Sequence, residues 1–246
     1  MMRGATISVE GLRVAYNGDA VLEGIDGEFA AGSLTAVLGP NGAGKSSLLA
    51  AMAGTIAPVA GRIRVSPPSR LAYLPQQSQI DRSFPIRVFD VVALGLVPRI
   101  GAWRGLDASQ RRQAQSALAA VGMAGQDRRL IGELSTGQLH RVLFARILLQ
   151  DAAVVLLDEP FNAIDSRTAN DMIRLLQAWH REGRTIVAVL HDHDLVRQHF
   201  TRCVLLARRC VAWGETGDVL RPDNLERARR LAAAWEAPMA DGRSAP

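Results

Sequence analysis

The chain contains the turn Gly39-Pro40-Asn41-Gly42-Ala43-Gly44-Lys45-Ser46, which fits the phosphate-loop pattern G-x-x-x-x-G-K-[ST]. Its glycines let backbone N–H groups turn inward around an anion, and a helix that follows adds its positive end. Lys45 is the one lysine among 29 basic residues. Because arginine serves almost everywhere else, position 45 requires a compact ammonium group that fits inside a phosphate-wrapping loop. The turn therefore predicts a site for the phosphates of a nucleotide.

The segments on both sides of this turn have the order of a phosphate-binding unit. The apolar run from Leu34 to Leu38 predicts a strand. Residues 46–53 favour a helix, which ends at Gly54, a glycine suited to a C-terminal cap. Strand, loop and helix in this order support a phosphate site over the alternative, a tight glycine-rich turn without a ligand.

A second apolar strand, Val154 to Leu157, delivers two acids at its carboxyl end, Asp158 and Glu159. Ligands of open parallel sheets collect at the carboxyl ends of the strands. Asp158 can hold Mg²⁺ and its waters, and Glu159 can polarise the water that attacks a γ-phosphate. Alone, this pair could merely cap a loop, but in a chain with a phosphate loop it favours catalysis.

The rest of the chain favours an α/β fold. Side chains alternate from Thr6 to Tyr16, which predicts a strand. A helix through Met172 and Trp179 separates the strand that ends at Leu157 from a run at 185–190, and this βαβ order implies a parallel sheet. Cys203 to Leu206 and Val211 to Trp213 predict a late hairpin.

A helical segment is predicted between these strands, from about residue 87 to 150. Within it, Asp107-Ala108-Ser109-Gln110 resembles a capping box, and apolar residues follow at helical spacing from Ala114 to Val121. From Pro222 onward we expect one helix rich in arginine and alanine and then a disordered end.

Composition narrows the class of protein. No stretch approaches the ~20 consecutive apolar residues of a membrane-spanning helix, and the first six residues lack the apolar core of a secretion signal. We therefore expect a cytoplasmic protein. Cys203 and Cys210 have neither metal-site nor redox spacing and predict reduced thiols on strands. The net charge is +5, but the arginines are scattered among acids, so no nucleic-acid partner is expected.

Leu134-Ser135-Thr136-Gly137-Gln138 opens a predicted helix and closely resembles the signature of the ABC ATPases. Ser135 can cap the helix together with Gln138, which leaves small side chains and a positive dipole end pointing outward. The bland alternative is an ordinary capping box. The resemblance implies that Ser135, Gly137 and Gln138 meet the γ-phosphate of ATP bound by a second subunit. The family usually has glycine at the position of Thr136. The larger threonine side chain would hinder the close approach of a phosphate, which leaves the effect on the turnover rate open.

The resemblance extends from Thr6 to about Leu220 and implies roles for further residues. It implies that Tyr16 stacks on adenine, although a lone tyrosine on a strand often only packs. It implies that Lys45 holds the β- and γ-phosphates and that Ser46 ligates Mg²⁺. The nucleotide-binding set implied for this segment is Gly39, Pro40, Asn41, Gly42, Ala43, Gly44, Lys45, Ser46 and Ser47.

Three more positions match functional elements of the family. Gln76 matches the glutamine that contacts Mg²⁺ and the attacking water, with Gln77 and Gln79 as neighbours in other registers. His191 matches the histidine that reaches the γ-phosphate; a metal-binding cluster over 191–194 is the alternative. Asp165 matches the acid of a loop that crosses the dimer interface.

The family implies an α/β fold: a RecA-like P-loop ATPase core with an antiparallel β portion and an inserted α-helical subdomain at about 87–150. We expect the ATPase domain to cover 1–220, followed by a C-terminal helix and flexible tail over 221–246. The implied cofactors are ATP and Mg²⁺. The implied assembly is a homodimer beneath integral membrane permease subunits, at the inner face of the membrane and indirectly served by a periplasmic or surface substrate-binding protein.

The cargo is suggested by two stretches, 81–92 and 160–165, which are similar to the branch that imports zinc or manganese. Siderophore, haem or another small nutrient is the alternative, because the ATPase does not touch cargo. Soluble ABC proteins of DNA repair or ribosomes usually carry two cassettes or a long coiled-coil insertion, and neither is found here. A GTPase needs a second lysine that the chain lacks. A nucleotide-binding module without catalysis conflicts with Glu159 and His191.

Overall fold

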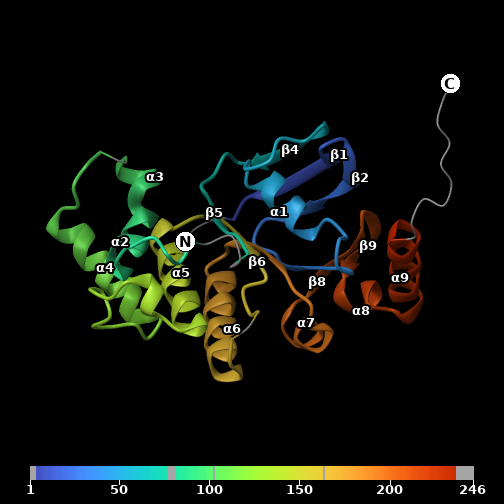
Figure 1. The fold of residues 1–246 in the computed structure, drawn as a ribbon. Helices are drawn as coiled ribbons and strands as arrows, with labels where there is room; N and C mark the ends of the chain where they lie inside the picture. The colour runs from blue at the N-terminus through green and yellow to red at the C-terminus, as the bar shows by residue number, and fades with distance from the viewer. Residues whose placement is uncertain (1–3, 77–80, 102, 163, 237–246) are drawn as a thin grey trace. The chain divides into compact units, whose positions relative to one another are not determined.

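The computed structural model describes residues 4–76, 81–101, 103–162 and 164–236. The chain forms two compact units, and both draw on separated parts of the sequence (Figure 1). Unit 1 comprises the described residues of Met1–Thr6, Ala30–Ser33 and Val65–Ala188, and unit 2 comprises Ile7–Phe29, Leu34–Arg64 and the described residues of Val189–Pro246. The predicted boundary at residue 220 and the predicted limits of an inserted subdomain stay predictions.

Unit 2 contains a three-stranded sheet in the order β2-β1-β4. The predicted strand β1 (Thr6–Tyr16) pairs antiparallel with β2 (Asp19–Phe29), and β4 (Ala60–Ser66) lies on its other side. The sequence did not predict β2 or β4. Glycines interrupt the apolar pattern of β2, and most of β4 is exposed, so neither strand carries a clear alternation.

Unit 2 also holds the strand that leads into the phosphate loop. All five residues of β3 (Leu34–Leu38) are buried, and β3 runs parallel to β8 (Arg202–Ala207). The hairpin of β8 with β9 (Arg209–Glu215) is confirmed. Helix α1 (Lys45–Met52) follows the loop, and Gly54, at φ 72°, completes its C-terminal cap because the N–H groups of residues 54 and 55 bond back to carbonyls of the last turn.

Unit 1 contains the predicted βαβ segment. Strand β6 (Val154–Asp158) is fully buried, pairs parallel with β5 (Leu71–Leu74) on one side, and lies beside β7 (Thr185–Val189) on the other. The connecting helix α6 (Ser166–Arg181) buries one face, including Met172 and Trp179. The sequence did not predict the four-residue strand β5, which is too short for a recognisable alternation.

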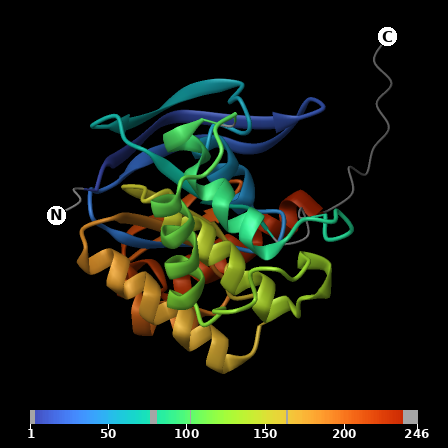
Figure 2. The same cartoon turned by 90° about the vertical axis from the view of Figure 1, so that its left-hand side faces the viewer.

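The residues between β5 and β6 form the helices α2 (Val88–Ala93), α3 (Val97–Ile100), α4 (Ala108–Ala120) and α5 (Thr136–Gln150), with 3₁₀ turns at Leu94–Leu96 and Ile131–Glu133. Figure 2 shows α2, α4 and α5 beside one another, and these three helices pack together. Ala114, Ala117 and Leu118 form the buried face of α4, as the helical spacing predicted.

The predicted capping box at α4 is present and supports a test of stability. The Asp107 carboxylate accepts from the N–H of Gln110 at 2.8 Å, and the Gln110 side chain accepts from the N–H of Asp107 at 3.0 Å. We expect Asp107→Ala to lower the free energy of unfolding by about 1 kcal/mol, and Asp107→Asn to change it little. Urea unfolding measures both. Equal transition midpoints for the alanine variant and the parent protein would show that the cap contributes nothing.

The end of the described chain is helical. Helix α8 covers Thr216–Val219 and α9 covers Pro222–Glu236, which confirms the predicted helix; the predicted tail at 237–246 lies outside the described residues. The ring of Trp235 lies over the Arg208 guanidinium, 4.6 Å from the ring centroid to the guanidinium carbon. Among the described residues, no helix combines the length and the apolar character that crossing a membrane requires.

Both cysteines are free thiols on the last hairpin, as predicted. Cys203 is buried in β8, and burial raises the pKa of its thiol to about 12. Cys210 in β9 is partly buried, and burial also raises its pKa. Thiolates are the reactive form, and burial disfavours the thiolate at both positions.

Candidate ATPase site

The phosphate loop joins β3 to α1, and its shape depends on glycine at two positions. Gly39 has φ 151°, and a Cβ there would lie 2.1 Å from the carbonyl oxygen of Leu206. Gly44 has φ 87°, and a Cβ there would lie 2.5 Å from Leu22 Cδ2. A side chain at either position would therefore push the loop out of place.

Lys45 lies inside this loop. It is only 6% exposed, and its Nζ donates to the carbonyl oxygens of Gly39 and Pro40, both at 2.9 Å. The loop backbone thus wraps around the ammonium group and fixes a positive charge where the N-terminal end of α1 adds its own. Because the side chain is enclosed in this way, we expect a planar guanidinium to fit poorly at this position. The role of Lys45 in phosphate binding stays a prediction.

Tyr16 and His191 are the other candidate residues of unit 2. Tyr16 is 44% exposed, so its ring is accessible. Its hydroxyl lies 3.4 Å from Ser47 Oγ, which places the ring beside α1, the helix that follows the phosphate loop. His191 is exposed directly after Leu190, whose N–H donates to the carbonyl of Val37 in β3 at 3.1 Å. The backbone next to His191 therefore lies beside the strand that enters the phosphate loop.

The acids after His191 serve as a helix cap. Asp192 Oδ1 accepts from the N–H groups of Asp194 and Leu195 at 2.9 and 3.0 Å at the start of α7 (His193–His199). Across the residues that the structure describes, no group of three histidine, cysteine, aspartate or glutamate side chains could hold a metal ion. The alternative of a metal cluster at 191–194 thus gains no support.

In unit 1, Glu159 follows β6 in a strained backbone conformation, with φ 51°. Its Oε2 accepts from Gln76 Nε2 at 3.0 Å and from Asn162 Nδ2 at 3.1 Å. The preceding Asp158 is buried, with 1% exposure. The structure therefore brings Gln76 and Glu159 together, as the predicted roles require. The alternative glutamines, Gln77 and Gln79, lie outside the described residues.

The predicted capping box of the signature segment is confirmed. Ser135 Oγ accepts from the N–H of Gln138 at 3.2 Å, and the N–H of Ser135 donates to Gln138 Oε1 at 3.0 Å. A Cβ on Gly137 would lie 3.6 Å from Asp165 Oδ2, which places this carboxylate beside the first turn of α5. Ser135 is exposed, and Thr136, Gly137 and Gln138 are partly exposed, so this helix end is accessible.

Asp165 is held by the start of α6. Its carboxylate accepts from the N–H of Thr168 at 2.9 Å and from the Thr168 hydroxyl at 2.8 Å, and these two bonds hold the pKa of Asp165 below its usual value. Arg141 of α5 donates to Thr168 Oγ1 at 3.1 Å and to Asp171 Oδ2 at 2.9 Å. The signature helix and the loop that carries Asp165 are therefore tied together through α6.

Sequence reasoning missed several groups that hold these segments. Arg82 donates to the carbonyl of Leu134, and Arg129 donates to that of Glu133 at 2.6 Å, so two guanidinium groups support the turn before Ser135. Asn162 Nδ2 donates to Glu159 Oε2 at 3.1 Å, a contact that the sequence did not predict. Arginine and asparagine are common in surface loops, and neither position carried a local signal for these contacts.

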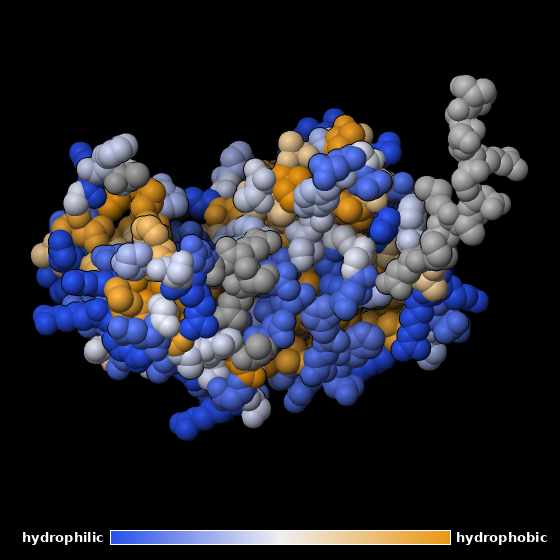
Figure 3. Space-filling model, viewed as in Figure 1, coloured by the Kyte–Doolittle hydropathy of each residue, from blue (hydrophilic) through white to orange (hydrophobic). Residues whose placement is uncertain are grey.

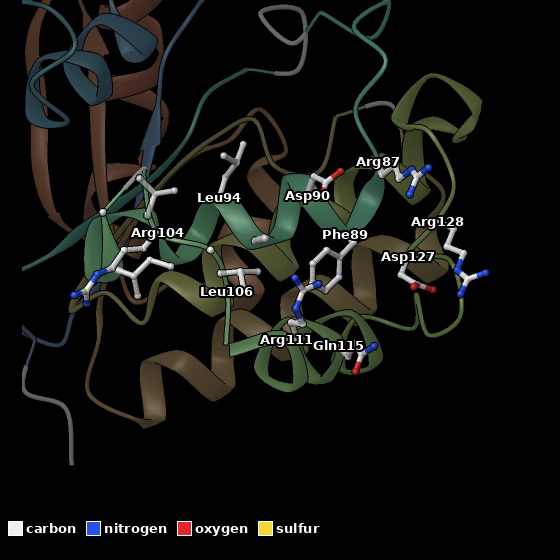
Figure 4. Close-up of a pocket in the computed structure, with 15 residues that line it drawn as sticks. Arg87, Phe89, Asp90, Leu94, Arg104, Leu106, Arg111, Gln115, Asp127 and Arg128 are labelled. Carbon is white, nitrogen blue, oxygen red and sulfur yellow. The ribbon is translucent and has the colours of Figure 1, made fainter. Parts of the chain in front are cut away.

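Unit 1 also contains a cavity of about 500 Å³ bordered by the loops and helices between β5 and α5. Figure 4 shows Phe89 of α2 and Arg111 of α4 pointing toward each other across it. Arginines line it together with two acids and apolar side chains such as Leu94 and Leu106. On the face shown in Figure 3, hydrophobic surface gathers over α3, next to this cavity. The cavity therefore combines apolar and cationic surface.

Comparison with known proteins identifies the class. The ABC transporter family profile matches residues 22–162. The manganese transport system ATP-binding protein MntB of Listeria monocytogenes is 38% identical over 226 residues, which cover 89% of this chain and 94% of that protein. The zinc transport system ATP-binding protein TroB of Treponema pallidum is 36% identical, with 90% and 86% covered. The chain belongs to the ABC transporter family and is an ATPase whose hydrolysis is coupled to transport.

Solved structures agree on the fold. The cbiO1 protein of Clostridium perfringens, part of an ABC transporter complex, is 26% identical with a TM-score of 0.72, covering 94% of this chain and 98% of that one. The ADP conformation of the ATP-binding cassette MJ1267 has a TM-score of 0.75 at 18% identity, with 92% and 98% covered. The predicted RecA-like P-loop ATPase fold is thereby confirmed.

Proposed function

We propose that this ATPase energises the import of a divalent transition metal, zinc or manganese, through separate membrane subunits. The observation that carries the proposal is the similarity over 89–90% of the chain to relatives named for manganese and zinc transport. The two names differ in the metal, so they support the class of cargo rather than one ion. ATPase subunits act on nucleotide, so the choice of metal belongs to the partners of this chain.

In this proposal Lys45 holds the β- and γ-phosphates, and Glu159 polarises the attacking water. Gln76, within hydrogen-bonding distance of Glu159, contacts the same water, and His191 reaches the γ-phosphate. Tyr16 stacks on adenine through its exposed ring. The two hydrogen bonds that Glu159 receives from Gln76 and Asn162 support its role, because a base must be held in place before it can direct a water molecule.

A hydroxyl, a buried carboxylate and a side-chain amide supply the oxygen ligands that Mg²⁺ prefers, which fits Ser46, Asp158 and Gln76. When bound there, the ion would neutralise charge on the transferring phosphate. Asp158 would hold it from the carboxyl end of β6, and Ser46 from the first turn of α1.

The proposed assembly is a homodimer with permease subunits at the inner face of the membrane, served by a separate substrate-binding protein. Ser135, Gly137, Gln138 and Asp165 would act on the nucleotide of the partner subunit. The accessible position of the first three at the start of α5, and of Asp165 beside them at the start of α6, supports this. We propose the cavity of unit 1 as the contact for the permease, because it joins apolar surface with arginines that suit an acidic helix.

Cellular metal content tests the proposed cargo. A strain that lacks the gene, grown in chelator-depleted medium, is expected to lose zinc or manganese selectively, and the intact gene is expected to restore it. The Lys45→Ala variant is the matched control and should not restore it. If both metals stay at the parental level in a strain shown to lack a redundant importer, the metal assignment is wrong; a fall in iron would instead indicate a siderophore or haem system.

A further inference from the structure

His140 of the signature helix is a buried histidine that the roles above do not use. Its side chain is 3% exposed, and its Nδ1 lies 2.8 Å from the carbonyl oxygen of Pro160. A carbonyl can only accept a hydrogen bond, so Nδ1 must carry the proton. Burial lowers the pKa of His140, which is consistent with a neutral ring that donates from Nδ1.

The other ring nitrogen of His140 is an unfavourably buried polar atom. Nε2 is buried and makes no hydrogen bond within the described part of the chain. An apolar side chain of similar volume would avoid this unpaired polar atom. The single useful polar contact of the ring is therefore the bond from Nδ1 to Pro160, and this bond is the physical reason for a histidine at this place in α5.

The accepting carbonyl belongs to the residue directly after Glu159. Glu159 lies at φ 51°, a conformation that a residue with a side chain keeps only when its surroundings hold it. Gln76 and Asn162 hold its carboxylate, and the N–H of Asn162 bonds back to its carbonyl at 3.2 Å. His140 holds the next peptide unit of the same turn, so a helix five residues past Ser135 fixes the backbone that aims Glu159.

We infer that His140 is a positioning residue for ATP hydrolysis: it ties the signature helix α5 to the turn that carries Glu159. The inference rests on the proposed role of Glu159 as the residue that polarises the attacking water. If the first turn of α5 moves when it meets a partner's nucleotide, the hydrogen bond from His140 Nδ1 to the carbonyl of Pro160 would transmit this movement to the turn that carries Glu159. His140, at 3% exposure, would act through the position of this turn and not through a contact of its own with the nucleotide.

The test compares replacements that remove or keep the donor. His140→Leu and His140→Met fill the space without a donor and are expected to lower kcat about tenfold while leaving KM for ATP within about twofold. His140→Asn places an amide N–H near the position of Nδ1 and is expected to recover most of kcat. His180→Leu is the matched control and should leave kcat unchanged. His180 is a second histidine of unit 1, and its buried Nδ1 makes no hydrogen bond to any described residue.

A double-mutant cycle separates this inference from the proposed role of Glu159. In the Glu159→Gln background, His140→Leu should reduce the remaining single-turnover rate much less than it does in the parent protein, because the group it positions is already disabled. If Glu159→Gln leaves kcat unchanged, the role of Glu159 is wrong. If Glu159→Gln lowers kcat but the folded Leu and Met variants keep parental kcat, only the inference about His140 is wrong. If neither variant folds, His140 is structural and the inference also fails.

Discussion

Lys45→Ala is expected to lower the rate of ATP hydrolysis at least about 100-fold and to weaken ATP binding, because the substitution removes the only lysine of the chain from the centre of the phosphate loop. In the parent protein, Nζ holds the carbonyls of Gly39 and Pro40 and presents its charge at the N-terminal end of α1. Alanine leaves these carbonyls without their donor and the phosphates without their cation. Phosphate release from Mg·ATP and calorimetric titration with ATP measure the two losses.

Lys45→Arg is the informative control. It keeps the positive charge. Of the 29 basic residues of the chain, the other 28 are arginines. The loop encloses a side chain that is 6% exposed, so we expect the larger, planar guanidinium to distort the loop. The ATPase activity of the Lys45→Arg variant should therefore be nearly as low as that of the Lys45→Ala variant. An arginine variant with parental activity would show that charge alone suffices and that the shape of the loop has been overrated.

Glu159→Gln is expected to lower kcat at least about 100-fold while ATP binding persists. The glutamine Oε1 can accept the same bonds from Gln76 and Asn162, so the turn keeps its geometry and only the charge that polarises water is lost. Because bound ATP is then not hydrolysed, we expect a dimer to accumulate with ATP on size-exclusion chromatography.

Glu159→Asp tests position rather than charge. Its shorter carboxylate cannot reach both donors from the same backbone, so we expect an intermediate loss of kcat without the ATP-dependent dimer. A Glu159→Gln protein that stays monomeric with ATP, or that hydrolyses ATP at the parental rate, would contradict the role assigned to Glu159.

Local signals account for what the sequence predicted well. The capping boxes at Asp107 and Ser135 depend on residues three positions apart, and both are present. The strand β3, the phosphate loop and α1 also follow one another directly in the chain, so pattern and composition suffice to predict their order. The fold of the family was implied by the resemblance that these local motifs carry, above all the signature segment that begins at Leu134.

Contacts between distant residues escaped the same reasoning. Gln76 and Glu159 are 83 residues apart and meet because β5 pairs parallel with β6, yet β5 is only four residues long and gave no clear pattern. The contact of His140 with Pro160 depends in the same way on how α5 packs. A single sequence shows which residues are present, but it does not show which distant strands and helices pack together and bring such residues into contact.

The position of Lys45 also gives the protein an unusual response to covalent labelling. Apart from the α-amino group at the start of the chain, its ε-amine is the only primary amine of the molecule, and it is enclosed by the two carbonyls that accept from it. Acylating reagents that modify dozens of surface lysines on ordinary proteins find one internal target here. Intact-mass spectrometry after brief acylation would therefore measure how accessible Lys45 is in the phosphate loop. Protection by nucleotide would appear as the loss of one mass increment, not as a shift in a broad distribution of masses.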